Sequence, residues 1–328
     1  MKGRFYGLIC LALLAARAAA GCDLCGVYMA TEAKESRAGF FVGAYEQYES
    51  YSTLQFDSKS LDNVAAQSFE RSLTQLVGGY RFNDRFSLQV DVPLIDEWYR
   101  RILGTSIQTG TTSGLGDLAL LGDFLVWQRG TMDNDITVHL LGGLKFPTGS
   151  TSWLAEGSAG TSTNGSGGHI HALPRPADPN SAVHGHELTL GSGSYDGIVG
   201  GSVNGRWNRV FAAARAQYAI RTIGDYYYQF ANDLTWSGGP GYYFWLGRNG
   251  TFSAQVNLSG ENKPEDTFRI YKVVNTGFTT VFVGPEFWFT WKENFSAAAG
   301  VDVPVIEDNT ALQLVPDYRL RFAASWRF

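Results

Sequence analysis

Apolar and polar residues alternate along the last segment of the chain, residues 312–328 (LQLVPDYRLRFAASWRF). Every second residue from Leu312 to Phe328 is apolar, and polar residues such as Arg319 and Arg321 lie between them. A period of two predicts a β-strand with one apolar and one polar face. The segment is much longer than the strands of about five or six residues in soluble sheets. A strand that crosses a membrane needs roughly 9–11 residues within the lipid, so the pattern favours a transmembrane strand.

The same alternation recurs along most of the chain and predicts twelve strands. Residues 96–114 lack the period and are predicted to form a long polar loop. The fold class is therefore predicted to be all-β, a single antiparallel transmembrane β-barrel. Nine of the predicted strands lie at about 38–55, 68–82, 85–95, 115–128, 135–147, 229–247, 276–291, 295–306 and 312–328. The sixth strand is predicted to end at Trp207, the seventh to begin at Arg209 and the ninth to follow Gly250.

The connections between these strands alternate between tight turns and generally longer segments. Outer-membrane barrels have this asymmetry, with short periplasmic turns and longer external loops. Five tryptophans near strand ends on the short-turn side are predicted to form an interfacial girdle: Trp127, Trp207, Trp245, Trp291 and Trp326. Simple counting places Trp127 and Trp245 in the lumen, so either a bulge shifts them or the girdle is partly coincidental.

Composition agrees with a barrel. Aromatic residues make up 14% of the 328 residues, there are 39 glycines, and only 17% of residues are charged. Ordinary soluble domains have roughly 25% charged residues. Without residues 1–20 the net charge changes from −5 to −8, because three basic and no acidic residues are removed. An acidic chain argues against nucleic acid as a partner.

Residues 1–20 are predicted to be a signal peptide, because a basic start precedes an apolar run and a small-residue cleavage site. Residues 21–37 are expected to lie in the periplasm or the lumen, and residues 38–328 to form the barrel. The C-x-x-C spacing of Cys22 and Cys25 suits a disulfide or half of a metal site. Lipidation of Cys22 is a further alternative.

Parity also predicts which charged side chains and which histidine face the lumen. Residues of both signs are present, so many are expected to pair across the lumen. They either fill and stabilise a narrow barrel or line a polar path for a solute. The predicted lumen-lining residues are Asp91, Asp117, Asp123, His139, Lys145, Arg215, Arg221, Glu261, Glu286, Asp302, Arg319 and Arg321.

The connection 148–189 is predicted to be a large external loop, and it holds four of the five histidines: His169, His171, His184 and His186. They form two H-x-H pairs, with Asp178 and Glu187 nearby. If the pairs lie on adjacent strands, four imidazoles converge on one ion such as Zn²⁺ or Cu²⁺. The alternative is a polar loop in which the histidines have no such role.

Four short motifs and the terminal Phe328 carry a resemblance to a known family. The motifs are Gly114–Leu118, Gly143–Gly149, Gly191–Asp196 and Asn275–Gly277. From about residue 80 onward the chain resembles the outer-membrane transporter family named after the MetA pathway of phenol degradation. The resemblance implies an outer-membrane barrel that passes small solutes, including apolar or aromatic ones. The C-x-x-C start and the histidine-bearing loop depart from that family and put a phenolic substrate in doubt.

Three functions remain open at this point. The first is a channel or transporter for small solutes, and the others are a metal-binding barrel and a structural barrel with a blocked lumen. No nucleophile–base pair points to an enzyme, since His139 has no serine partner identifiable in the sequence. The expected location is the bacterial outer membrane. The expected partners are its lipid, a small solute, and the outer-membrane assembly machinery through the strand that ends at Phe328.

Overall fold

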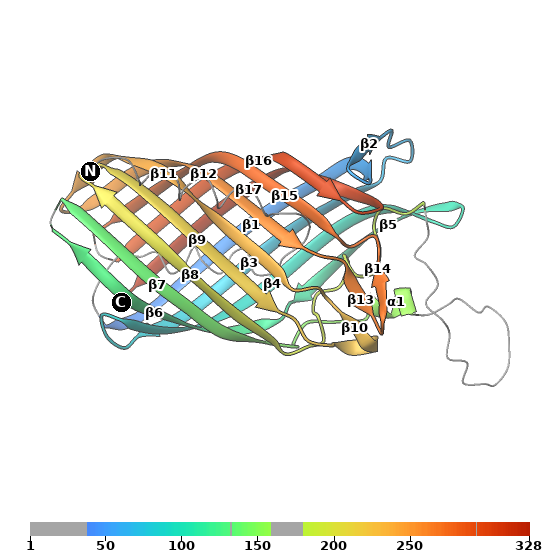
Figure 1. Ribbon diagram of the computed structural model, residues 1–328, viewed down its shortest axis with the longest axis horizontal. Helices are drawn as coiled ribbons and strands as arrows, with labels where there is room; N and C mark the ends of the chain where they lie inside the picture. The colour runs from blue at the N-terminus through green and yellow to red at the C-terminus, as the bar shows by residue number, and fades with distance from the viewer. Residues whose placement is uncertain (1–37, 132, 159–179, 293) are drawn as a thin grey trace, which may run out of the picture.

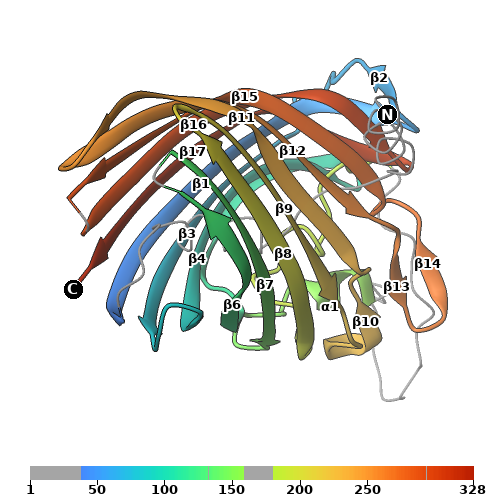
Figure 2. The same cartoon turned by 60° about the vertical axis from the view of Figure 1, so that its left-hand side comes forward.

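The computed structural model describes residues 38–131, 133–158, 180–292 and 294–328. Twelve long strands close into a single antiparallel β-barrel (Figure 1). The last strand pairs with the first, from Phe41 opposite Arg327 to Phe56 opposite Leu312, and Figure 2 shows the two side by side. The predicted fold class and strand number are confirmed. In chain order the strands are β1 (Gly39–Phe56), β3 (Ser68–Arg81), β4 (Phe86–Leu103), β6 (Leu118–Gly130), β7 (Asn134–Phe146), β8 (Asp196–Trp207), β9 (Val210–Ile220), β11 (Asp233–Gly247), β12 (Gly250–Lys263), β15 (Phe278–Trp291), β16 (Phe295–Asn309) and β17 (Leu312–Arg327).

The smaller elements gather at one end of the barrel, on the right in Figure 1. We name this end the loop end and the opposite end the turn end. The strands β10, β13 and β14 form a separate three-stranded sheet, whereas β2 and β5 extend the barrel wall. The small elements are β2 (Lys59–Leu61), β5 (Ser106–Leu115), α1 (Leu154–Ser158), η2 (Asp225–Tyr227), β10 (Tyr228–Gln229), β13 (Asp266–Phe268) and β14 (Tyr271–Val273).

At the turn end, every connection between barrel strands spans at most four residues. In the turn between β3 and β4, Asn83 Oδ1 accepts hydrogen bonds from the backbone N–H groups of Arg85 (2.8 Å) and Phe86 (3.0 Å). Such Asn side chains favour tight turns because they replace missing backbone partners. At the loop end, the link between β16 and β17 is as short, and the other connections are longer. The predicted alternation of tight and longer connections is confirmed.

The prediction of a polar loop at 96–114 is wrong. Residues 96–103 continue β4 to its loop-end terminus, and β5 pairs back onto them as a hairpin. The inward side chains here include Glu97 and Arg101, both buried. The strand therefore loses its apolar period while keeping its alternation of buried and exposed positions.

The barrel exterior is apolar, and large exposed hydrophobic side chains occur on all twelve barrel strands. All five predicted girdle tryptophans face outward, with exposures between 41% and 50%. Register shifts between Leu125 and Trp127 in β6, and between Tyr243 and Trp245 in β11, turn Trp127 and Trp245 to the outside. A bulge adds one residue to a strand and so reverses the alternation beyond it. The bulge alternative is therefore confirmed.

Candidate functional site

Part of the connection between β7 and β8 folds back into the mouth of the barrel. We name residues 180–195 the inner loop. Its Ala182, Val183 and Leu188 are buried in one cluster with side chains from four barrel strands: Tyr51, Phe69, Tyr99 and Leu314. Burial of such side chains contributes about 1.5–3 kcal/mol each for a Val or Leu. The inner loop is thus packed onto the barrel wall rather than extended into solvent.

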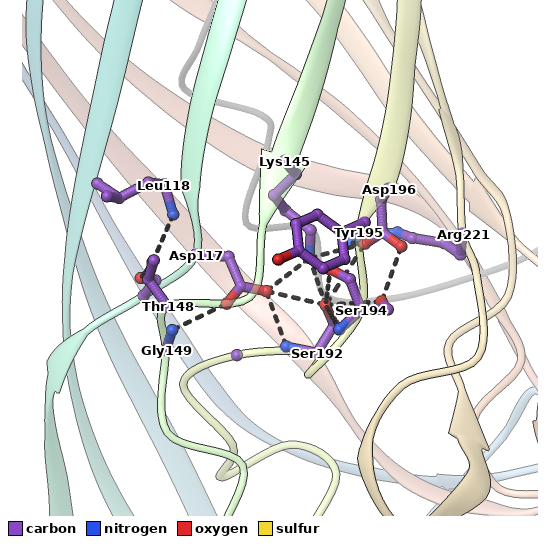
Figure 3. Close-up of polar contacts among 12 residues, drawn as sticks. Asp117, Leu118, Lys145, Thr148, Gly149, Ser192, Ser194, Tyr195, Asp196 and Arg221 are labelled. Carbon is purple, nitrogen blue, oxygen red and sulfur yellow. Dashed lines mark hydrogen bonds and ion pairs between the residues drawn. The ribbon is translucent and has the colours of Figure 1, made fainter.

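A single carboxylate, Asp117, holds both ends of this connection (Figure 3). Its Oδ1 accepts the backbone N–H of Gly149 at 2.9 Å, and its Oδ2 accepts the N–H and hydroxyl of Ser192 at 2.8 and 2.9 Å. The two chain ends approach so closely that side chains do not fit there. A Cβ on Gly149 would lie 2.4 Å from the carbonyl oxygen of Leu190, and one on Gly191 would lie 2.6 Å from Asp117 Oδ1.

Asp117 belongs to a chain of buried charges that we name the loop-end ionic cluster. Lys145 Nζ lies 2.8 Å from Asp117 Oδ2 and 2.9 Å from Asp196 Oδ2. Arg221 continues the chain, 3.1 Å from Asp196 and 2.8 Å from Asp233. No side chain of the five is more than 5% exposed. Buried charges persist only when they are paired, so the cluster fixes the geometry of this part of the wall.

Three of the sequence motifs meet in this cluster. Gly114–Leu118 supplies Asp117, Gly143–Gly149 supplies Lys145 and the N–H of Gly149, and Gly191–Asp196 supplies the N–H of Ser192 and the Asp196 carboxylate. The motifs are therefore the parts of one latch that closes the β7–β8 connection onto the wall.

A second group of buried charges lies near the midpoints of β15, β16 and β17, and we name it the central ionic cluster. Asp302 accepts hydrogen bonds from Arg319 (3.0 and 2.8 Å) and from Arg321 (2.7 and 3.0 Å). Arg321 Nη1 also donates to Glu286 Oε1 at 2.6 Å. The Arg319 guanidinium lies 4.2 Å from the centroid of the Phe282 ring. These large side chains narrow the interior at mid-height.

Three cavities follow one another inside the barrel, and β12 passes all of them. Ser253 and Gln255 line a cavity of about 670 Å³ that opens toward the turn end. Asn257 and Ser259 line a gap of about 50 Å³ beside the central ionic cluster. Lys263 lines a cavity of about 80 Å³ under the inner loop. The described interior is therefore wide at the turn end and narrow from the midpoint to the loop end.

The structure buries ten of the twelve residues that parity places in the lumen, and His139 and Glu261 are half-buried. Some of their ion pairs run along the wall between neighbouring strands, and pairing across the lumen stays a prediction. His139 Nδ1, for example, lies 2.9 Å from Asp123 Oδ1 on the adjacent strand. Their burial agrees with an inward orientation, and their part in a solute path stays a prediction. The ten buried residues are Asp91, Asp117, Asp123, Lys145, Arg215, Arg221, Glu286, Asp302, Arg319 and Arg321.

Sequence reasoning missed several partners of these residues. Asp196 and Asp233 complete the loop-end ionic cluster, and Glu97 pairs with Arg71 at 3.4 Å while fully buried. Asp196 was visible within a motif, but nothing in the sequence marked it as a partner of Lys145. Counting alternation past residue 95 would have placed Glu97 inside.

Two of the four loop histidines lie in the inner loop, and Glu187 joins them. His184 Nδ1 is 3.4 Å from Glu187 Oε2, and His186 Nε2 is 3.5 Å from Glu187 Oε1. Burial alone would raise the pKa of the Glu187 carboxyl. The electrostatic influence of the neighbouring His186 and His184 outweighs burial and holds that pKa well below its usual range.

The expected arrangement of the H-x-H pairs on adjacent strands does not hold for this pair, because residues 185–187 form a turn. The other pair, His169 and His171, lies outside the described residues. So do the predicted signal peptide at 1–20 and the Cys22–Cys25 motif. Among the helices of the described segments, none is long and apolar enough to cross a membrane.

No family model and no curated protein sequence matches the chain. Among solved structures, it is similar to an outer-membrane channel from Pseudomonas putida F1, with 12% identity and a TM-score of 0.56, over 91% of this chain and 98% of that one. It is also similar to the β domain of the Bordetella autotransporter BrkA, with 11% identity and a TM-score of 0.44, over 90% and 100% of the two chains. The first similarity shows that the fold is that of outer-membrane barrels, as the resemblance in sequence implied and as the predicted location requires.

Proposed function

We propose that this chain is a channel for small solutes in the bacterial outer membrane, and that the inner loop and the two ionic clusters control its passage. The run of three cavities along β12, inside a closed barrel, carries this proposal. The apolar exterior contacts lipid, and the terminal strand ending at Phe328 engages the assembly machinery. The fold shared with an outer-membrane channel supports the proposal.

The size of the wide cavity suits a small molecule. Its volume of about 670 Å³ lies in the usual range of ligand pockets, about 300–1,000 Å³. The lining combines charged side chains of both signs, such as Asp123 and Arg206, with aromatic side chains such as Trp288, so it suits small solutes that have both polar and apolar parts. The aromatic part of the lining is compatible with the apolar or aromatic solutes that the sequence resemblance implies.

The gap beside the central ionic cluster limits what can pass. A water molecule needs about 10–15 Å³ of such space, so a gap of about 50 Å³ holds only a few waters. An organic solute therefore requires movement of the arginine side chains or of the inner loop. The described conformation is the narrow state of the proposed channel.

The latch residue Lys145 offers a direct test. Lys145→Met removes the cation between Asp117 and Asp196 and leaves two buried carboxylates without it. We expect the inner loop to loosen and the uptake of small sugars and amino acids into proteoliposomes to rise several-fold, measured as the swelling rate. Lys59→Met, at an exposed position of β2, is the matched control and should leave the rate unchanged.

The milder variant Ser192→Ala removes a hydroxyl bonded to Asp117 and keeps the charges, so it serves if Lys145→Met fails to fold. Folding is checked by heat-modifiable mobility on gels. Swelling no faster than that of protein-free liposomes, in the wild type and in folded latch variants alike, would contradict the channel and support a structural barrel with a blocked lumen.

The barrel interior also contains the Asp123–His139 pair, and we propose that this pair takes part in solute passage rather than in catalysis. His139 lies opposite Ser202 in the register of β7 and β8, and Asp123 contacts its Nδ1. No hydrogen bond joins Ser202 to His139 in the described structure. The neighbouring strand N–H groups are engaged in the β-ladder, so they are not available as donors for an oxyanion.

A further inference from the structure

His184, His186 and Glu187 bring three metal-ligating groups to one point of the inner loop. One donor atom from each lies within 4.8 Å of the others. Each histidine nitrogen is already 3.4–3.5 Å from a Glu187 oxygen. Bonds of about 2.0–2.1 Å in a tetrahedral zinc site separate neighbouring ligand atoms by about 3.3–3.4 Å. The two contacts use different oxygens of Glu187, so a carboxylate that binds the ion through one oxygen has one such ligand-to-ligand distance nearly in place.

The second imidazole lacks the partner that a buried ring nitrogen needs. The His186 side chain is only 10% exposed, and its Nε2 is buried without a hydrogen-bond partner among the described residues. A buried polar atom left in this way costs about 1–3 kcal/mol. The ring is held in place by stacking on His184 (5.4 Å) and on Tyr228 (6.3 Å). An electron-pair acceptor such as a metal ion would satisfy this nitrogen.

The surroundings of the three groups provide room and second contacts. His186 and Glu187 line the cavity of about 80 Å³ under the inner loop, which has space for an ion with a bound water. The Asn275 side-chain nitrogen lies 2.9 Å from His184 Nδ1. Rotation of that amide would release the nitrogen of His184 and present an oxygen to the ion. Second contacts of this kind orient metal-binding histidines.

The cations that line the same cavity are neutralised locally. Lys263 lies 2.9 Å from Asp266, and Arg71 lies 3.4 Å from Glu97. Arg221 is paired with two carboxylates of the loop-end ionic cluster. Burial and the Asp266 carboxylate raise the pKa of the Tyr228 phenol, so the phenol remains a donor to Asp266 at 2.7 Å. Glu187 is left as the carboxylate that faces the two imidazoles.

We propose that His184, His186 and Glu187 bind a divalent transition-metal ion, for which Zn²⁺ is the best match. Two imidazoles and one carboxylate, with one position open, are a donor set that zinc accepts. All three ligands belong to one turn, so the bound ion would stabilise the conformation of this turn of the inner loop. The proposed site takes one of the two H-x-H pairs expected from the sequence and adds Glu187 as its third ligand.

The test is calorimetric titration of the purified full chain in detergent with zinc chloride. It uses the background Cys10→Ser, Cys22→Ser, Cys25→Ser, which removes every cysteine of the chain, because thiolates also bind zinc. We expect one Zn²⁺ per chain. His186→Ala and Glu187→Gln should each weaken binding by at least about 100-fold, since even second-shell changes cost 10–100-fold. Glu265→Gln, an acid at the same end of the barrel, and the double variant His169→Ala, His171→Ala should leave binding intact.

Zinc binding that survives His186→Ala and Glu187→Gln would overturn this assignment. So would loss of zinc binding in the His169→Ala, His171→Ala double variant, or the absence of zinc binding in the parent chain. Glu187→Gln keeps the size of the side chain, so it stays informative if His186→Ala does not fold. Calorimetry requires no transport. A failure of the metal site is therefore distinguishable from a failure of the channel, which the swelling assay reports separately.

Discussion

The two halves of the barrel interior differ although one wall encloses both. The turn-end half holds a cavity of about 670 Å³, lined partly by small residues such as Gly205, Ala213 and Ser253. The half from the midpoint to the loop end holds two gaps of about 50 and 80 Å³, two buried ionic clusters and the inner loop. The barrel backbone alone therefore does not set the width of the passage. The size and charge of the inward side chains set it.

The largest effect on stability is expected from a substitution in the central ionic cluster of the narrow half. Asp302 accepts four hydrogen bonds from Arg319 and Arg321. Asp302→Ala leaves two buried guanidinium groups facing each other, and we expect a loss of about 3–5 kcal/mol in the free energy of unfolding. Urea titration of the refolded barrel, followed by tryptophan fluorescence, measures the change.

The matched control is Asp308→Ala near the loop end of the same strand. Asp308 accepts a hydrogen bond from the Ser58 hydroxyl in a more exposed setting, and its loss should cost less than about 1 kcal/mol. Equal losses at Asp302 and Asp308 would contradict the idea that buried charge pairs shape the narrow half.

A smaller effect is expected where the inner loop is latched. Gly191→Ala places a Cβ 2.6 Å from Asp117 Oδ1 and 2.8 Å from the Gly149 backbone. Overpacking of this kind costs about 1–3 kcal/mol, and it should also raise the swelling rate by displacing the inner loop. Gly142→Ala, whose Cβ would have nothing within 4 Å, should change stability by less than about 0.5 kcal/mol. If both substitutions change the swelling rate to a similar extent, the idea that the latch at Asp117 restricts solute passage is contradicted.

The smallest effect concerns the turn-end rim, where bulges turn two tryptophans outward. Trp127→Phe and Trp245→Phe keep an aromatic ring on the lipid side and should each cost less than about 1 kcal/mol, because burial of the ring is largely retained. In single-tryptophan variants, which keep Trp127 or Trp245 and replace the other eight tryptophans of the chain, brominated lipid should quench the remaining fluorescence. Quenching by a water-soluble agent in place of brominated lipid would show that the ring faces the lumen.

The architecture was predictable because its signals are local. Alternation along each strand and the tight turns beside Asn83 or Asn294 depend on neighbouring residues. Even the ambiguous Trp127 and Trp245 pointed to bulges, which the register shifts confirm. The prediction failed at residues 96–103, because polar side chains on both faces of this part of β4 remove the hydropathy signal but not the strand.

The site was less predictable because its parts are distant in sequence. Asp117, Lys145, Asp196 and Arg221 meet only after four chain segments are folded together. The inward fold of the inner loop depends on apolar contacts with other strands, which no local pattern reveals. Glu187 was adjacent to an H-x-H pair, yet only the turn at 185–187 shows that it faces both imidazoles.

Asp117 accepts hydrogen bonds from Gly149 and Ser192 with its two oxygens, so a single carboxylate marks where the β7–β8 connection leaves the wall and where it returns. Because both ends of this connection lie at one point, its length does not affect the distance between β7 and β8. Its length and composition could change over evolutionary time while the cylinder beneath stayed as it is. Because Asp117 fixes both ends of the β7–β8 connection, new binding residues can arise in this connection without changes to the barrel strands.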